Sequence, residues 1–249
     1  MTELTVECWA GRKYTFDPAR TALLVIDMQR HFLEPVAEEQ DDSAEGVAAA
    51  SAEQDAANAT GDEDVADADA PVPVDTSEII PRVARLLALA RRLGCMIVHT
   101  REGYSPDLAD VSAFRHDLGY VGHPTPLGLS LIRGEPGHDF VQDLLPLPGE
   151  AIIDKASFGA FYQTELHDIL QDAGIDHLIL AGVTTQCCVH STLREAVDRG
   201  YWCLTVADCC AASEEGLHEA ALIIIAGEGH LFGWICDVED LEAASTVSV

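Results

Sequence analysis

Lysine and long apolar runs are the two features that this sequence most clearly lacks. Only two of its 14 basic residues are lysines, Lys13 and Lys155. The longest apolar run, residues 220–226, is far shorter than the roughly 20 residues that a membrane-spanning helix needs. The first ten residues are polar and include two glutamates, so no apolar signal segment is apparent. We therefore expect a cytoplasmic protein that does not cross a membrane.

Positive charge is scarce as a whole, and the formal net charge is -29. Nucleic acids and anionic membrane surfaces would repel such a chain, so neither is expected as a partner. Residues 33–78 hold 15 acidic residues and no basic ones, and the rest of the chain is acidic as well. This balance fits either a high-salt cytoplasm or a GC-rich coding bias, and the sequence does not separate the two.

Metal-binding cysteine patterns are also absent. The eight cysteines include adjacent pairs at 187–188 and 209–210, and none shows the Cys-x-x-Cys spacing of zinc sites. In a reduced compartment most of them are expected to fill the core as small apolar side chains. We predict no metal and no cofactor.

The length and the 48% hydrophobic content predict a single domain that spans residues 1–249. Residues at about 34–75 are rich in Ala, Asp and Glu and contain no aromatic residue, so they cannot bury enough surface to become ordered. We interpret them as a disordered acidic surface insertion. An acidic arm that binds a partner is the alternative.

Apolar runs and helical periodicities alternate along the rest of the chain. The runs predict strands and the periodicities predict helices. Strands are expected at 21–27, 95–99, 151–154, 177–181 and 202–206, and helices at 76–93, 161–173, 188–198 and 216–226. Residues 100–141 show little periodicity, which is typical of a long loop over a site. This alternation predicts an α/β fold, a doubly wound, Rossmann-like, three-layer parallel sheet with right-handed crossovers.

Three chemically useful side chains follow three of the predicted strands. They are Asp27, Lys155 and Cys188, and the carboxyl ends of parallel strands are where such sheets bind ligands. Cys188 also lies where a strand turns into a helix, and a helix N-terminus favours a thiolate and thereby lowers the pKa of a thiol. The three residues predict a nucleophile with an acid/base partner and a cation.

The sequence around these residues resembles a known superfamily. Residues 25–29 (Val-Ile-Asp-Met-Gln), 154–161 (Asp-Lys-Ala-Ser-Phe-Gly-Ala-Phe) and 182–189 (Gly-Val-Thr-Thr-Gln-Cys-Cys-Val) resemble, in order and spacing, the three signatures of the isochorismatase-like cysteine hydrolases. Further blocks are most similar to the biuret and triuret hydrolases within it, namely 99–103, 106–110, 133–137 and 194–201.

The resemblance implies a metal-independent cysteine amidohydrolase that cleaves a linear C–N bond of a small ureide or carboxamide through a thioester and releases ammonia. It implies that Cys188 is the nucleophile, that Asp27 is the acid/base and that Lys155 stabilises the thiolate. The N–H groups of Thr184 and Cys188 would form the oxyanion hole, beside a cis bond between Val183 and Thr184. The family also implies a homo-oligomer, a dimer or a tetramer.

The substrate depends on other positions. The resemblance implies substrate contacts for five residues, namely Phe32, Phe161, Thr185, Gln186 and Glu228. In three places the chain departs from the family pattern. His31 replaces an acid, Glu228 replaces a glutamine, and residues 156–159 replace a Pro-Gly-Lys-Gly stretch, so a second site cation is missing. Amidases for N-carbamoyl amino acids or nicotinamide remain alternatives, as does a non-catalytic scaffold of the same fold.

Overall fold

The centre of the protein is a six-stranded sheet in which every strand runs parallel to its neighbours. The computed structural model describes residues 3–34 and 75–246, and the predicted acidic insertion lies outside these residues apart from its two ends. The sheet order is β10-β9-β8-β3-β4-β7. The strands are β3 (Thr21–Ile26), β4 (Met96–Glu102), β7 (Ala151–Lys155), β8 (His177–Val183), β9 (Trp202–Ala211) and β10 (Trp234–Cys236).

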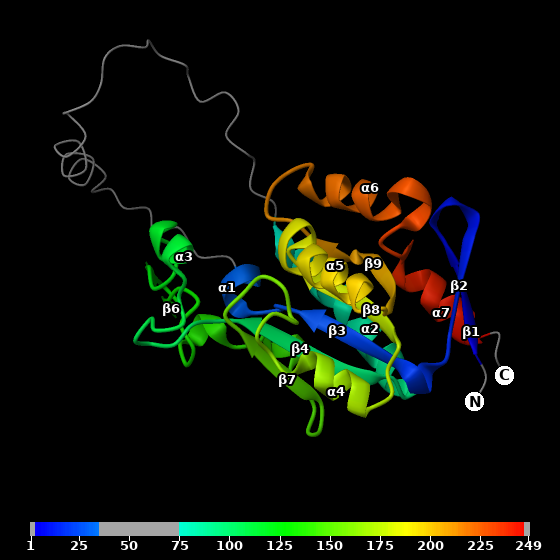
Figure 1. Ribbon diagram of the computed structural model, residues 1–249, viewed down its shortest axis with the longest axis horizontal. Coiled ribbons are helices and arrows are strands. Elements are labelled where there is room, and N and C mark those ends of the chain that lie inside the picture. The colour runs from blue at the N-terminus through cyan, green and yellow to red at the C-terminus, as the bar shows by residue number, and fades with distance from the viewer. Residues whose placement is uncertain (1–2, 35–74, 247–249) are drawn as a thin grey trace, which may run out of the picture.

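Helices cover both faces of this sheet, which confirms the predicted doubly wound α/β fold (Figure 1). One face packs against α2 (Ile80–Leu93) and α7 (Val238–Thr246), and the other packs against α4 (Leu166–Asp172), α5 (His190–Asp198) and α6 (Leu217–His230). Since β3 is apolar and buried along its whole length, it can lie in the middle of the sheet between two helical layers. Within the described residues no helix is long and apolar enough to cross a membrane.

An N-terminal hairpin, which we did not predict from the sequence, completes one face. Its strands β1 (Leu4–Cys8) and β2 (Arg12–Phe16) pair antiparallel, and side chains of β1 alternate between buried and exposed. The buried ones join the core cluster that contains α2 and α7. At the far end of the sheet from this hairpin lie the short helices α1 (Arg30–Leu33) and α3 (Ala113–Asp117) (Figure 1).

Several predicted boundaries were wrong. The predicted helix at 161–173 begins only at Leu166, because residues 156–165 first turn across the end of the sheet. Strand β4 continues to Glu102 and β9 to Ala211, and the second extension follows a register shift against β8.

The predicted loop after β4 is partly ordered into small elements. It contains α3 and a short hairpin of β5 (Pro124–Thr125) and β6 (Gly128–Leu129). We refer to residues 103–135 as the capping loop. Its own small apolar cluster is formed by Tyr104, Leu131 and Ile132, against which Phe32 packs. The capping loop thereby covers the carboxyl end of the sheet, where the predicted site residues lie.

Candidate active site

The crevice between β3 and β8 is the point at which the chain changes direction in the sheet. From β3 the chain adds β4 and β7 on one side, and it then adds β8, β9 and β10 on the other. Ligands of doubly wound sheets bind at the carboxyl ends of the strands at this switch point. Asp27 directly follows β3, and Cys188 lies one turn after β8. Both are buried, and their side chains approach each other within 4.8 Å. The structure therefore brings these two predicted residues together.

Asp27 and Lys155 form a fully buried ion pair. The Lys155 Nζ lies 2.7 Å from Oδ2 of Asp27, although its angles are not those of an aligned hydrogen bond. Thr100 donates a 2.6 Å hydrogen bond to Oδ1 of the same carboxylate, and Lys155 donates to the carbonyl of Ser157 at 2.8 Å. Burial lowers the pKa of Lys155, but the charge of Asp27 and the other acidic groups nearby outweigh it and hold that pKa above the usual lysine range. Lys155 is therefore a buried cation in contact with Asp27.

Cys188 lies in a π-helical turn, Thr185–Val189, that leads directly into α5. The carbonyl of Thr184 accepts from the N–H groups of Cys187 and Val189, at 3.1 and 3.2 Å, which fixes the turn. The Cys188 thiol is 5% exposed and donates to Oε2 of Glu102 at 3.6 Å. The turn thus aims the thiol at the end of β4.

The helix N-terminus was expected to lower the pKa of the Cys188 thiol, but in the structure this pKa is raised. The neighbouring Cys187 thiol and burial raise the pKa of Cys188 well above the ordinary cysteine value, and the Lys155 charge only partly opposes this. Two carboxylates face the sulfur, because Asp27, Glu102 and Cys188 each place an atom within 4.8 Å of the others. These surroundings therefore favour the neutral thiol of Cys188 over the thiolate.

Glu102 belongs to the site, but its sequence context gave it no role beyond membership of the block at 99–103. It ends β4, between the strands that carry Asp27 and Lys155, and it is 3% exposed. Burial raises its pKa, although the Lys155 charge lowers it in part. A strand-end acid was the available signal, but the predicted strand stopped at His99.

Arg115 is the second residue that the sequence reasoning missed. It comes from α3 in the capping loop, and its Nη2 lies 3.1 Å from Oε1 of Glu102. The guanidinium carbon lies 3.4 Å from the centre of the Phe158 ring. The sequence predicted that the site lacks a second cation, because residues 156–159 contain no lysine. The structure corrects this, since Phe158 from that same segment packs on an arginine from elsewhere.

The predicted oxyanion hole has the expected backbone around it. The Val183–Thr184 bond is cis, as the resemblance implied. Gly182 has φ 124°, and a Cβ on it would collide with the carbonyl oxygen of Ile26, so only glycine allows β8 to approach β3 this closely. The Thr184 N–H as an oxyanion donor stays a prediction.

Three of the five predicted substrate contacts lie near Asp27, Lys155 and Cys188, which we call the triad. Thr185 and Gln186 belong to the turn that holds Cys188, and Phe32 packs beneath the capping loop. The Thr185 hydroxyl is 2.8 Å from Nδ1 of His218. The Oε1 atom of Gln186 is buried and has no partner in the described part of the chain.

Phe161 and Glu228 require correction. Phe161 is 2% exposed and stacks on Tyr201, with 5.8 Å between ring centres, so it belongs to the core on the α4–α5 face. Glu228 lies near the end of α6, which runs back from the carboxyl end of β9 to the start of β10. It is therefore exposed near the opposite edge of the sheet, beside Arg194 and Phe232.

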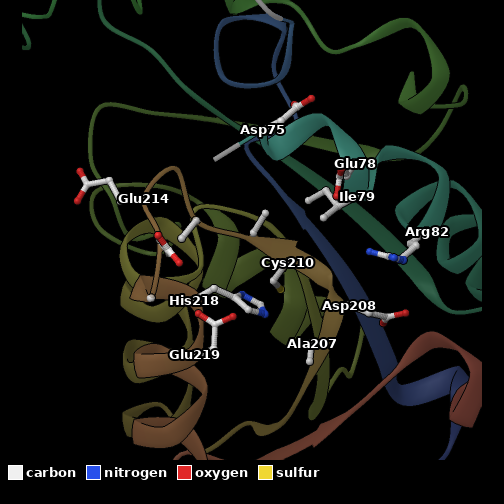
Figure 2. A pocket seen from close by; sticks show the side chains of 14 residues that line it. Asp75, Glu78, Ile79, Arg82, Ala207, Asp208, Cys210, Glu214, His218 and Glu219 are labelled. Carbon is white, nitrogen blue, oxygen red and sulfur yellow. The ribbon is translucent and has the colours of Figure 1, made fainter. Parts of the chain in front are cut away.

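A large open cavity lies beside the triad rather than on it. It measures about 600 Å³, and Figure 2 shows Asp75, Glu78 and Arg82 on one wall and His218 and Glu219 on the other. Asp27, Lys155 and Cys188 are not among its lining residues. Among the described residues, Asp27, Lys155 and Cys188 place two charged groups beside a buried thiol, so we keep this cluster as the candidate active site.

A metal at this site would have to displace a cation. Among the described residues, the one group of potential ligands close enough together is Asp27, Glu102 and Cys188. The ammonium of Lys155 already contacts Asp27. The absence of a metal stays a prediction.

Comparisons with known proteins agree with this geometry. The isochorismatase domain matches residues 21–240. Ureidoacrylate amidohydrolase RutB of Methylorubrum extorquens is 32% identical over 178 residues, which cover 68% of this chain and 71% of that protein. RutB of Methylobacterium radiotolerans shares the same identity and covers 68% of both chains.

Two solved structures share the fold. A cysteine hydrolase from Pseudomonas syringae pv. phaseolicola superposes with a TM-score of 0.70 at 24% identity, over 98% of this chain and 100% of its own. The N-carbamoylsarcosine amidase of Thermoplasma acidophilum superposes with a TM-score of 0.60 at 19% identity, over 88% and 97% of the two chains.

Proposed function

The chain belongs to the isochorismatase family and is a hydrolase of that family, and from this premise we propose that it is a cysteine amidohydrolase that cleaves a linear C–N bond of a small ureide or carboxamide. The observation that carries the proposal is the contact of Asp27, Lys155 and Glu102 around one buried thiol at the switch point of the sheet. The names of the ureidoacrylate amidohydrolases support the ureide class of substrate.

The first half-reaction forms a thioester. Asp27 takes the proton of the Cys188 thiol, and the thiolate attacks the carbonyl carbon of the substrate. The carbonyl oxygen becomes an oxyanion that accepts from the N–H groups of Thr184 and Cys188. The C–N bond then breaks, and Asp27 returns its proton to the departing nitrogen, which leaves as ammonia.

The second half-reaction restores the enzyme. Asp27 takes a proton from a water molecule, and the resulting hydroxide attacks the thioester carbon. The C–S bond breaks, the acid product leaves, and the proton on Asp27 returns to the sulfur of Cys188. Each turnover therefore consumes one water and releases one ammonia and one acid.

Lys155 and Glu102 act on the sulfur from two sides. The positive charge of Lys155 stabilises the thiolate once it forms, and its contact with Oδ2 holds the Asp27 carboxylate in place. Glu102 accepts the S–H hydrogen bond in the resting state, which makes it the competing candidate for the base. We assign the proton transfer to Asp27, the role that the resemblance of residues 25–29 to the family signature implies, and we assign to Glu102, whose Oε1 contacts Arg115 and the hydroxyl of Tyr104, the holding of the resting thiol through Oε2.

Ammonia release from a panel of ureides and amides tests the proposal. The panel contains biuret, triuret, nicotinamide and N-carbamoylsarcosine, at low and high salt. We expect release from at least one compound, and iodoacetamide should label Cys188 in the active protein. If no compound released ammonia and iodoacetamide left Cys188 unlabelled, the chain would be a non-catalytic member of the family.

A further inference from the structure

Arg115 is a buried cation with unused hydrogen-bonding capacity. Its side chain is 7% exposed, and its Nη1 atom is buried without any acceptor among the described residues. Its Nη2 atom lies 3.1 Å from Oε1 of Glu102 and likewise makes no aligned hydrogen bond in the described part of the chain. A guanidinium has five N–H donors, so this arginine offers more than Glu102 accepts. Buried donors without partners are rare in folded proteins, and they indicate a missing ligand.

Aromatic rings hold this guanidinium in a fixed plane. Phe158 stacks at 3.4 Å from the guanidinium carbon to the ring centre, and the rings of Tyr104 and Tyr120 lie at 5.8 and 5.7 Å. Stacking covers the faces of the group and leaves its edge for acceptors in the same plane. An edge of a guanidinium matches the two oxygens of a carboxylate.

The position of Arg115 relative to the nucleophile sets the size of the ligand. Glu102 contacts the Cys188 thiol with one oxygen and Arg115 with the other. The sulfur and the guanidinium are therefore separated by two contacts and the width of one carboxylate. A small molecule with a carbonyl at the sulfur and a second group a few bonds away can reach both.

Of the two buried cations at the site, Arg115 is the one that can bind an anionic ligand. Lys155 already pairs with Asp27, so Arg115 is not needed there. Glu102 contacts Arg115 through Nη2, and the buried Nη1 atom has no acceptor among the described residues, so this atom can bind a second carboxylate. A ligand carboxylate would pair with the unused edge of Arg115 in a region screened from water, where charge-assisted hydrogen bonds are strong.

We propose that Arg115 binds a carboxylate of the substrate, so that the preferred substrates are small ureido acids rather than neutral ureides. This inference rests on the proposed function, because it places a ureide carbonyl at Cys188. It goes beyond that function by naming the group that selects the substrate and the residue that recognises it.

A matched pair of compounds tests this recognition. 3-Ureidopropionate and its methyl ester have the same ureide, and only the first carries a carboxylate. We expect kcat/KM for ammonia release to favour the acid over the ester by about 100-fold, as a charge-assisted bidentate contact implies. Arg115→Met should remove that preference, and Arg115→Lys should keep part of it, because lysine retains the charge but lacks the planar fork. The loss should appear in KM for the acid.

Arg194→Met is the matched control. Arg194 also packs on an aromatic ring, with 4.1 Å from its guanidinium carbon to the centre of Phe232, but it lies outside the site. Its replacement should leave the preference for the acid unchanged. If Arg115→Met lowered kcat/KM for acid and ester equally, Arg115 would only balance the charge of Glu102, and the proposal would be overturned.

Binding to the Cys188→Ala variant separates this proposal from the proposed function. Calorimetry should show that this variant binds 3-ureidopropionate more tightly than the ester, and that adding Arg115→Met removes the difference. Equal binding of both compounds would overturn the carboxylate site, whatever the activity of the wild type. Tight, Arg115-dependent binding in a protein that releases no ammonia would retain the site and overturn the proposed reaction.

Discussion

The carboxyl edge of the sheet and the capping loop enclose the same small volume, but they contribute to it in different ways. The edge supplies Asp27, Glu102, Lys155 and the turn that carries Cys188, all at or just after strands of a rigid sheet. The capping loop supplies Arg115 from a five-residue helix. Strand ends fix positions accurately, which chemistry requires, whereas loops vary easily, which selectivity permits. The comparison suggests that the edge sets the reaction and the loop sets the substrate.

Loss of the nucleophile should have the largest effect on the edge. Cys188→Ala should lower kcat by about 10⁴-fold on every substrate, because the remaining groups cannot form the thioester. Cys187→Ala is the matched control, since Cys187 lies one residue away and is partly exposed. It should retain turnover within a few-fold. An inactive Cys187→Ala beside an active Cys188→Ala would reverse the assignment.

Replacement of the buried cation comes next. Lys155→Met leaves Asp27 as an unpaired buried charge, so we expect kcat to fall by about 10³-fold and the folded state to lose about 3 kcal/mol. Steady-state kinetics and chemical denaturation measure the two effects. Lys13→Met, which removes the other lysine at an exposed salt bridge, serves as the control. Lys155→Met with normal turnover would show that the thiolate needs no cation.

Thr100 contributes through Asp27. Thr100→Val keeps the shape of the side chain but removes the 2.6 Å hydrogen bond to Oδ1 of Asp27. We expect kcat to fall by about 10-fold, since a buried hydrogen bond to a charged group is worth about 1.5 to 3 kcal/mol and other contacts still hold Asp27. The drop should be equal for acidic and neutral substrates. A change in their ratio would contradict the division between edge and loop.

Removal of the ring that stacks on Arg115 should, unlike Thr100→Val, change the ratio of activities on acidic and neutral substrates. Phe158→Leu loses the stacking of the guanidinium, and the preference for 3-ureidopropionate over its methyl ester should fall by about 5-fold. Phe232→Leu removes the equivalent ring under Arg194 and should leave the ratio unchanged. Equal effects of the two variants would mean that Phe158 acts only through general packing.

Glu102 gives a smaller effect that depends on pH. Burial raises its pKa in the folded protein, so its contribution to stability is present below the unfolded pKa and is lost as pH rises through the folded value. Glutamine does not titrate. The Tm of Glu102→Gln should therefore rise relative to wild type as the pH is raised from about 4, near the ordinary glutamate pKa, to neutral. A difference that stays constant across this range would contradict the raised pKa.

The edge could be predicted from the sequence because its signals are local. The apolar runs that precede Asp27, Lys155 and Cys188 are short, continuous and each followed by a polar residue, so topology alone brings their ends together. Glu102 was missed because three polar residues, Thr100–Glu102, continue the strand. Thr100 and Glu102 are buried, and their burial depends on neighbours that the sequence pattern does not show.

The loop could not be predicted because its contacts are distant in sequence. Arg115 meets Glu102 and Phe158 across chain separations that no periodicity encodes. The same reason explains the wrong placements of Phe161 and Glu228. Phe161 turns into the core although it ends the matched motif at 154–161, and Glu228 lies near the end of a helix that runs away from the site.

Trapping of the covalent intermediate tests the central claim most directly. Protein quenched in acid during turnover of an active substrate should carry the mass of the acyl group, and peptide mapping should place it on Cys188. The account predicts that the adduct is absent from Cys187 and from Cys188→Ala protein. Sustained ammonia release with no adduct on Cys188, or with the adduct on Cys187, would contradict it.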